Sequence, residues 1–392
     1  MRFLILSTDY PDFLSWFYAQ HPGLEEGPYE QQLRARMESL FGVADFYSSN
    51  LGRLGHQAWD VHANNKFMQK AWAREHGLQV DEANSARERM WALRQRLGPI
   101  AAKTPIWHLR PLWRPLLGCG NGSPAWFYNI LAAQIREYKP DILLNQSMDG
   151  ISSHFLREMK SSLRLLVGQI AAPLPESQDF SEYDLIVSSL PNFVDHFRSM
   201  GLVAELNRLA FEPRILSNLK DGPRNIPVSF VGSVTRHHRA RVQLLEYLCA
   251  RQHVQVWGGE KGLPRDSSIR LSHMGHAWGR EMYEVLHRSK ITLNHHIEVA
   301  GPFANNSRVF EATGTGTLLI TDWKKNLYEM FEAGKEVVTY RTPEECIELL
   351  SYYLDHDEER ESIARAGQQR TLRDHTYYQR MGELVEIVRR YN

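Results

Sequence analysis

The chain has 392 residues, which is too long for one ordinary hydrophobic core and predicts about two domains. Its 46 basic and 46 acidic residues balance, so no overall charge favours nucleic acid or an anionic membrane as a partner. No apolar run approaches the roughly 20 residues that a membrane-spanning helix needs, so we expect no transmembrane segment. Peripheral membrane contact through some of the ten Trp residues stays open, beside the plainer interpretation that they line cores and pockets.

The three cysteines, Cys119, Cys249 and Cys346, are scattered and form neither a metal-binding spacing nor a disulfide framework. They fit a reduced, cytoplasmic setting. The segment from Met1 to Ser7 is too short for the apolar region of a signal peptide, and Asp9 follows it closely. We therefore expect it to be a first strand.

Apolar segments alternate with helical patterns along residues 1–220. Strands are expected at 3–7, 57–61, 142–145, 163–170, 183–188 and 203–209. One helix is expected to begin at 29, helices are expected within 66–117, another helix should end near 138, and a last one should cover 191–200. A long aromatic loop is expected from Phe13 to Tyr29. Strands that alternate with helices predict a parallel, doubly wound sheet.

A polar segment rich in Pro and Gly follows at 217–227 and is typical of a domain boundary. After it, strands are expected at 228–233, 254–257, 291–294, 317–321 and 337–340, with helices at 238–251, 279–288 and 343–354 and two more before the end. We predict domains at 1–220 and 221–375, with a C-terminal helix over 376–392 that ties the two together. Two Rossmann-like halves joined by a hinge place a ligand cleft between them.

The stretch from Ile291 to Asp322 carries the clearest chemistry. A strand leads into a polar loop, and a short helix then begins at Ser307, with Asn306 or Ser307 as its N-cap. Backbone N–H groups at a helix N-terminus bind phosphate, and Arg308 adds a forked cation. Glu311 offers a carboxylate to the hydroxyl groups of a ribose, although the alternative of a cap or an ion pair within the helix stays open.

The C-terminal half resembles the CgeB-like glycosyltransferases of the GT-B fold, the glycosyl transferases group 1 type. The resemblance rests on blocks in the right order: VSFVGS at 228–233, RHHRAR at 236–241, HAWGREMY at 276–283, SKITLN at 289–294, NSRVFEATGTGTLLITD at 306–322 and HTYYQR at 375–380. It covers about residues 225–392, while the N-terminal half is similar only in outline.

This resemblance implies a nucleotide-sugar donor of the UDP, GDP or TDP type, held mostly by the C-terminal domain. The implied donor-binding residues are Gly232, Ser233, Arg236, Arg239, Trp257, His276, Asn294, His295, Asn306, Arg308, Phe310, Glu311, Gly314, Thr315 and Gly316. Among them, Glu311 is expected to bind the ribose, and the turn at 314–316 is expected to face the pyrophosphate or the sugar.

The chain departs from the family pattern at one position. The E-x7-E pattern places its first acid eight residues before Glu311, where this chain has Phe303. Sugar recognition must therefore come from elsewhere. The resemblance also implies metal independence, because GT-B enzymes usually work without a metal, so we expect arginines and helix N-termini to meet the leaving-group charge. Adjacent strand residues point to opposite faces, which disfavours His295 and His296 as a metal pair.

The acceptor side has weaker signals. An inverting reaction needs a base in the N-terminal half, and Asp149 and Asp9 follow strands at suitable positions. A retaining reaction needs no such base. Expected acceptor-binding residues are Trp16, His21, Glu26 and Tyr29, with plain packing, capping or solvation as the alternative for each.

The sequence thus predicts a cytoplasmic, metal-independent GT-B glycosyltransferase that transfers a sugar to an acceptor hydroxyl of a glycan, a protein or a small molecule. One alternative is a sugar-nucleotide epimerase or hydrolase on the same fold, since a fold does not settle function. Another is a non-catalytic scaffold protein that binds sugar nucleotides.

Overall fold

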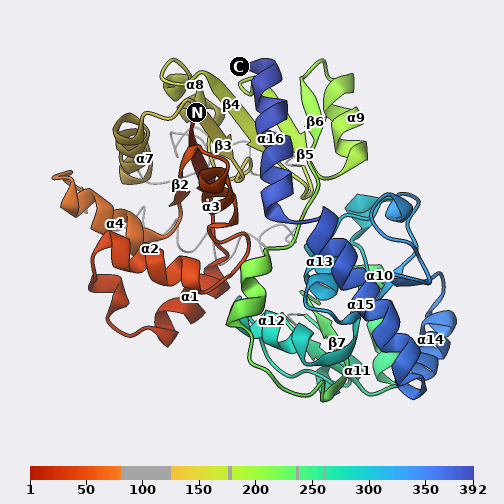
Figure 1. The fold of residues 1–392 in the computed structure, drawn as a ribbon. Helices are drawn as coiled ribbons and strands as arrows, with labels where there is room; N and C mark the ends of the chain where they lie inside the picture. Colours follow the sequence, from red (N-terminus) through yellow and green to blue (C-terminus); the bar gives the residue numbers. More distant parts are fainter. Residues whose placement is uncertain (81–124, 175–178, 235–237, 260–261) are drawn as a thin grey trace, which may run out of the picture.

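The computed structural model describes residues 1–80, 125–174, 179–234, 238–259 and 262–392. Its strands form two separate sheets, each with all of its strands parallel (Figure 1). The N-terminal sheet has the order β2-β1-β3-β4-β5-β6, and the C-terminal sheet has the order β11-β10-β9-β7-β8. In each sheet the strand order reverses beside the first strand, which marks the edge where ligands of open α/β sheets bind.

The N-terminal sheet comprises β1 (Arg2–Ser7), β2 (Gln57–His62), β3 (Ile142–Asn145), β4 (Leu165–Gln169), β5 (Leu185–Ser188) and β6 (Ala204–Leu206). Its helices are α1 (Pro11–Gln20), η1 (Leu24–Glu26), α2 (Tyr29–Glu38), α3 (Phe46–Arg53), α4 (Lys66–Glu75), α7 (Ala125–Tyr138), α8 (Ser153–Lys160) and α9 (Pro191–Ser199). All six predicted strands are present. The aromatic loop predicted from Phe13 to Tyr29 is wrong over its first part, because Pro11–Gln20 forms a helix with Pro11 in its first turn.

The C-terminal sheet comprises β7 (Ile226–Val231), β8 (Val254–Trp257), β9 (Ser289–Asn294), β10 (Leu318–Asp322) and β11 (Val338–Tyr340). Its helices are α10 (Arg239–Cys249), α11 (Ser268–Leu271), α12 (Arg280–His287), η6 (Glu298–Ala300), α13 (Ser307–Gly314), η7 (Leu327–Glu329), α14 (Pro343–Asp355) and α15 (Asp357–Asp374). Asn306 caps α13 and Thr342 caps α14, each through its side chain, as the sequence predicts.

The last helix, α16 (Tyr377–Tyr391), returns to the N-terminal half and packs beside α3 (Figure 1). A capping box formed by Thr376 and Gln379 starts it. Its buried face joins one apolar cluster that contains residues of both halves. The predicted crossing of this helix back to the first domain is confirmed.

The connection between the halves includes η5 (Pro213–Asn218) and is fixed by contacts far apart in sequence. Phe211 exchanges backbone hydrogen bonds with the segment before α16, donating to His375 O at 2.9 Å and accepting from Tyr377 N at 3.0 Å. Its ring lies so close to Gly314 that a Cβ there would come within 2.4 Å. Glycine at position 314 therefore permits the close packing of the connection on α13.

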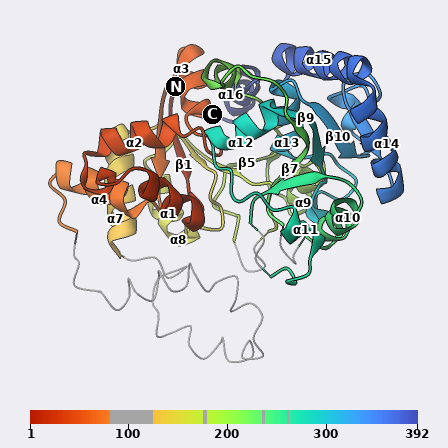
Figure 2. The same ribbon diagram turned by 90° about the horizontal axis from the view of Figure 1, so that it is seen from below.

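A second contact joins the halves at the start of α12, which lies beside the N-terminal half (Figure 2). The N–H of Arg280 donates to the carbonyl of Ser39 at 2.9 Å. Trp278 packs its ring edge-on against Phe41, with 5.2 Å between the ring centroids. We call this contact, formed by Trp278, Gly279 and Arg280 against Ser39 and Phe41, the aromatic latch.

Candidate functional site

The N-terminus of α13 lies at the carboxyl edge of the C-terminal sheet. Asn306 accepts a hydrogen bond from the N–H of Arg308 at 2.8 Å and donates its amide to Asn294 Oδ1 at 2.8 Å. Asn294, the last residue of β9, in turn donates to Thr321 Oγ1 at 2.9 Å. This chain of amides fixes the helix start against the strand ends, and the helix dipole makes the same end favourable for an anion.

Arg308 and Glu311 form an ion pair at this helix start, with 2.9 Å between Arg308 Nη1 and Glu311 Oε2. The two atoms are not aligned for a hydrogen bond, and Arg308 Nε has no partner. Burial raises the pKa of Glu311, while Arg308 and Tyr283 oppose that shift. The guanidinium of Arg308 and the carboxylate of Glu311 thus lie together near the N-terminus of α13, and both have unused hydrogen-bonding capacity.

The loop after β9 places the predicted donor-binding residue His295 beside Tyr340, which the sequence analysis did not single out. His295 Nδ1 lies 3.0 Å from the Tyr340 hydroxyl. His296 contacts Asp322 instead, through its Nδ1 at 2.7 Å and its backbone N–H at 3.0 Å. The two rings therefore have different partners, as expected for adjacent residues. The pKa of Asp322 is held below its ordinary range because His296, His295 and Lys324 outweigh the effect of burial.

Arg241 is a buried arginine that sequence reasoning missed. Its guanidinium donates to the carbonyls of Ser233 at 3.0 Å and His295 at 2.9 Å, and its Nε has no partner. It thereby ties the exit of β7 to the exit of β9. The sequence analysis chose its neighbours Arg236 and Arg239, but Arg239 is exposed and Arg236 lies outside the described residues. The sequence signal that could have pointed to Arg241 is its place in the same predicted helix, two residues after Arg239.

The exits of β7 and β8 approach each other closely. Gly232 donates its N–H to Trp257 O at 2.9 Å, and a Cβ on Gly258 would meet Gly232 O at 2.2 Å. Gly258 has φ +132, so glycine meets both the close approach and the backbone angle. Gly258 also donates to Gly275 O at 2.9 Å, which brings the loop of His276 to the same edge. His276 is exposed and stacks on Trp278.

The predicted phosphate turn at 314–316 lies elsewhere. Gly314 packs on Phe211, Thr315 is fully buried, and Gly316 lies beside Arg224 and Gln368. These residues are at the C-terminal end of α13, about 12 Å from its start by helical rise. The structure therefore does not bring them together with Asn306 and Arg308, and they pack against the domain connection and α15 instead.

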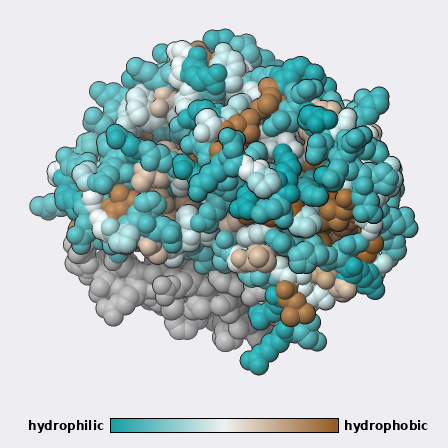
Figure 3. Space-filling view, turned by 60° about the horizontal axis from the view of Figure 1, so that its bottom comes forward, coloured by the Kyte–Doolittle hydropathy of each residue, from teal (hydrophilic) through white to brown (hydrophobic). Residues whose placement is uncertain are grey.

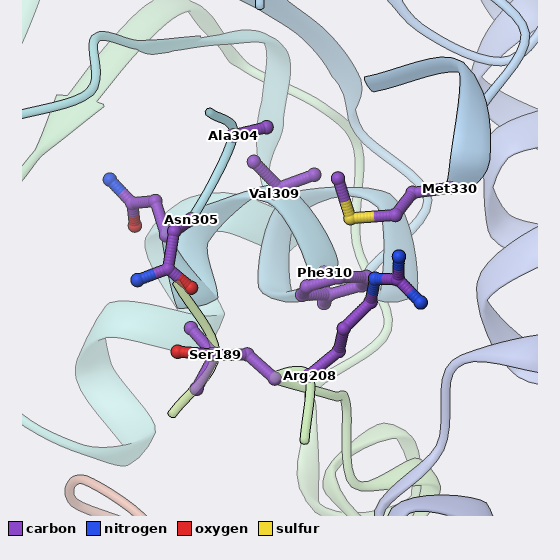
Figure 4. Close-up of a pocket in the computed structure, with 9 residues that line it drawn as sticks. Ser189, Arg208, Ala304, Asn305, Val309, Phe310 and Met330 are labelled. Atoms are coloured by element: carbon purple, nitrogen blue, oxygen red, sulfur yellow. The ribbon is translucent and has the colours of Figure 1, made fainter. Parts of the chain in front are cut away.

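A pocket opens between the two halves beside the helix start (Figure 4). It is lined by Ser189, Arg208, Leu209, Ala304, Asn305, Asn306, Val309, Phe310 and Met330. Ser189 and Arg208 come from the N-terminal half, and Figure 4 shows them opposite the residues of α13 and the loop before it. Phe310 is buried in its wall. The start of α13 thus faces the interdomain space.

Asp9 is held by Arg36 and His62, which argues against a role as a free base. Arg36 donates to it from Nε and Nη2, at 2.6 Å for the shortest contact, and His62 Nδ1 lies 3.2 Å from its Oδ2. Burial favours the neutral acid, but His62 and Arg36 outweigh it and hold the pKa of Asp9 well below its ordinary range. A carboxylate held so firmly as an anion is a poor proton acceptor. Its neighbour His62 is buried with Nε2 unpartnered, which sequence reasoning missed.

The remaining predicted residues of the N-terminal half lie in different surroundings. Asp149 is exposed in the turn after β3. Trp16 packs on Phe13 in an aromatic cluster that includes Trp278. The other acceptor candidates are His21 and Glu26, both exposed, and Tyr29, which belongs to the core. The structure does not gather these residues into one acceptor site, and Tyr29 is explained by packing.

Among the described residues, no group of three or more His, Cys, Asp or Glu side chains could hold a metal ion, and no helix is long and apolar enough to cross a membrane. On the face in Figure 3, the described residues are mainly hydrophilic, with hydrophobic residues in small separate groups. Metal independence and peripheral membrane contact stay predictions.

Solved structures of other proteins resemble this fold. The fold resembles a glycosyltransferase from Rickettsia africae (13% identity, TM-score 0.55, covering 100% of this chain and 98% of the other). It also resembles Anabaena Alr3699/HepE in complex with UDP-glucose (10% identity, TM-score 0.58, covering 99% of this chain and 99% of the other). A third similar structure is sucrose-phosphate synthase from Thermosynechococcus elongatus (8% identity, TM-score 0.54, covering 100% of this chain and 98% of the other).

Two parallel α/β sheets, a shared match over the whole chain and a returning last helix define the class: the protein has the GT-B fold. Residues 236–386 match a family model described as Glycosyl transferase-like. No curated protein matches the chain. The matched segment contains β9, α13 and β10, which form the site described above.

Proposed function

We propose that this protein is a glycosyltransferase, of the CgeB-like type, that moves a sugar from a nucleoside-diphosphate sugar to an acceptor hydroxyl. The observation that carries the proposal is the start of α13, where Arg308 and Glu311 lie buried together at a helix N-terminus beside the interdomain pocket. The family match over this segment supports it.

The donor is best accommodated with its pyrophosphate at the N-terminus of α13. The helix dipole and Arg308 meet the phosphate charge there. Arg241 adds a buried positive charge that no carboxylate of the described residues pairs within salt-bridge distance. Glu311 then accepts the ribose hydroxyl groups, which requires it to share or exchange its contact with Arg308.

The same groups supply the chemistry. Departure of the nucleoside diphosphate leaves negative charge on the pyrophosphate, and preorganised cations and helix N–H groups stabilise that charge. Such a site works without a metal ion. On the acceptor side, an inverting reaction would take the proton of the attacking hydroxyl on a base of the N-terminal half. Asp149 is the candidate for this base, because it is exposed after β3, whereas Arg36 and His62 hold Asp9 as an anion.

A thermal-shift panel with UDP, GDP, TDP, CDP and CMP, with and without magnesium, tests the donor site. A ligand at 100 times its dissociation constant stabilises a protein by about 2.7 kcal/mol. We expect one nucleoside diphosphate to raise the Tm without magnesium. If none of the five shifts the Tm, the donor site is wrong.

Turnover assays then separate the alternatives. A transferase releases nucleoside diphosphate fastest with a hydroxyl acceptor present. An epimerase or hydrolase consumes the sugar nucleotide without an acceptor, and a scaffold protein binds it without turnover. The first substrates to assay are nucleotide hexoses that carry the base identified in the thermal-shift panel.

A further inference from the structure

His296 is held in one orientation at the carboxyl edge of the C-terminal sheet. Its Nδ1 and its backbone N–H both contact Asp322 Oδ1, at 2.7 and 3.0 Å. Asp322 also contacts Lys324 at 3.2 Å, and Lys324 donates to Gly301 O at 2.9 Å. The loop after β9 is thereby fastened at both ends, and the imidazole has no freedom to turn without losing these contacts.

The other ring nitrogen of His296 has no hydrogen-bond partner, although the residue is only 2% exposed. Buried polar groups in proteins are nearly always paired, and an unpaired one is costly. Asp322 takes Nδ1, so Nε2 is the atom left to receive a group from outside the chain. A buried, oriented and unpaired nitrogen indicates a binding position for a polar ligand atom.

The surroundings of His296 connect it to the proposed donor site. Two residues earlier, Asn294 bonds the Asn306 amide that caps α13. Three residues later, Val299 O accepts a hydrogen bond from Asn192 of the N-terminal half at 3.4 Å. The loop that carries His296 therefore runs from the helix start that would hold the pyrophosphate to a contact with the opposite half of the protein.

We propose that His296 Nε2 binds a hydroxyl group of the donor sugar and acts as a residue that determines sugar specificity. This inference rests on the proposed function. A hydroxyl both donates and accepts, so it satisfies Nε2 whether the ring is neutral or protonated. The E-x7-E pattern has no acid at Phe303, and a sugar contact from His296 supplies recognition that this departure removes from the loop.

Calorimetric titrations without any acceptor provide the test, using a nucleoside diphosphate and the matching nucleotide sugar. His296→Phe keeps a ring of similar size but removes both nitrogens. We expect it to weaken binding of the nucleotide sugar roughly 5- to 30-fold, as for one lost hydrogen bond, and to leave binding of the diphosphate alone within about twofold. His296→Gln, which keeps a polar end, should lose less.

A matched control is His287→Phe, because His287 is a half-buried histidine of the same half on α12, with its Nδ1 near Thr315 O. It should bind both ligands as the wild type does. Sugar nucleotides that lack or invert single hydroxyl groups extend the test: the wild type should discriminate at one position, and His296→Phe should lose that discrimination.

Three results would overturn the inference. Equal loss for diphosphate and nucleotide sugar would assign His296 to the phosphates or to loop structure. Unchanged binding of both would leave Nε2 without a ligand contact. An effect that arises only with an acceptor present would move the contact to the acceptor. Failure of the wild type to bind any nucleoside diphosphate would instead refute the proposed function.

Discussion

Arg308 and Glu311 form an ion pair with each other, with 2.9 Å between Arg308 Nη1 and Glu311 Oε2 and only 12% of each side chain exposed. Each is the residue best suited to a different part of a nucleotide, since the guanidinium fits phosphate and the carboxylate fits ribose. The pair keeps two buried charges compensated when no ligand is bound. Ligand binding must then replace one charge-assisted contact with others.

Arg308→Ala and Glu311→Ala are each expected to weaken nucleoside-diphosphate binding by on the order of 1–3 kcal/mol, the range for charge-assisted hydrogen bonds. Because the two side chains interact, the double variant should lose less than the sum of the single losses. Calorimetry measures the affinities, and far-UV circular dichroism checks that the fold is kept. Unchanged affinity in both single variants would place the donor site elsewhere.

Local signals in the sequence account for much of the fold. Thr342 followed by Pro343 predicts a capped helix start, and the structure has Thr342 accepting from the N–H of Glu345 at 3.2 Å. Gly201 after α9 has φ +79, as a helix-ending glycine does. These calls succeed because the deciding contacts lie within a few residues of each other.

The failures come from contacts between distant residues. Gly314 looks like a phosphate-turn glycine, but its neighbour is Phe211, about a hundred positions earlier in the chain. Asp9 follows a strand as a catalytic carboxylate does, yet Arg36 and His62 surround it. His296 and Asp322 meet only because β9 and β10 are adjacent in the sheet. The spacing of residues along the sequence does not predict such pairs.

Gly279→Ala is expected to open the aromatic latch. Gly279 has φ +52, and a Cβ there would lie 2.0 Å from the Ser39 carbonyl oxygen of the other half. A backbone contact that close forces the two halves apart. We expect a larger radius of gyration in small-angle X-ray scattering and a raised KM for the donor.

The matched control for this change is Gly301→Ala. Gly301 has φ +55, so alanine suffers similar backbone strain of about 1 kcal/mol, but nothing lies within 4 Å of its Cβ position. It should lower the Tm slightly and leave the scattering profile unchanged. Equal effects of the two variants would show that backbone strain, not the interdomain contact, matters at Gly279.

Acid should weaken the protein through Asp9. Its folded-state pKa lies below the ordinary value because His62 and Arg36 outweigh burial. A depressed carboxyl pKa contributes stability above the unfolded value of about 4, and that contribution is lost as the pH falls below it. Asp9→Asn should cost on the order of 3 kcal/mol at pH 7, since it also leaves the buried Arg36 without its counter-charge.

Urea unfolding of the wild type and Asp9→Asn at pH 7 and pH 3 measures this contribution. The difference between the two proteins should shrink at pH 3, because the unfolded wild type binds a proton at Asp9 below about pH 4 while the folded protein keeps this carboxylate ionised. A difference that stays constant between the two pH values would mean that the pair with Arg36 and His62 does not hold Asp9 ionised.

Asp60 should have the opposite pH dependence. It is buried in β2 and hydrogen-bonded by the Ser48 hydroxyl. Burial raises its pKa to about 7, and the charge of Asp45 adds to the rise, while Ser48 and Arg36 oppose it. Between the unfolded pKa of about 4 and pH 7, the folded chain therefore holds a proton that the unfolded chain has lost.

That proton makes the contribution of Asp60 to stability fall as the pH rises through this window, by about 2–3 kcal/mol between pH 5 and pH 8. Asp60→Asn removes the ionisation and should flatten this part of the profile, so that the variant gains on the wild type as the pH rises. Exposed Asp195→Asn, which removes a charge from the surface of α9, should leave the slope unchanged. Urea unfolding midpoints at half-unit steps from pH 5 to pH 8 provide the measurement. Parallel profiles for the wild type and Asp60→Asn would show that Asp60 stays ionised in the folded protein, and that a counter-charge near β2 compensates its burial.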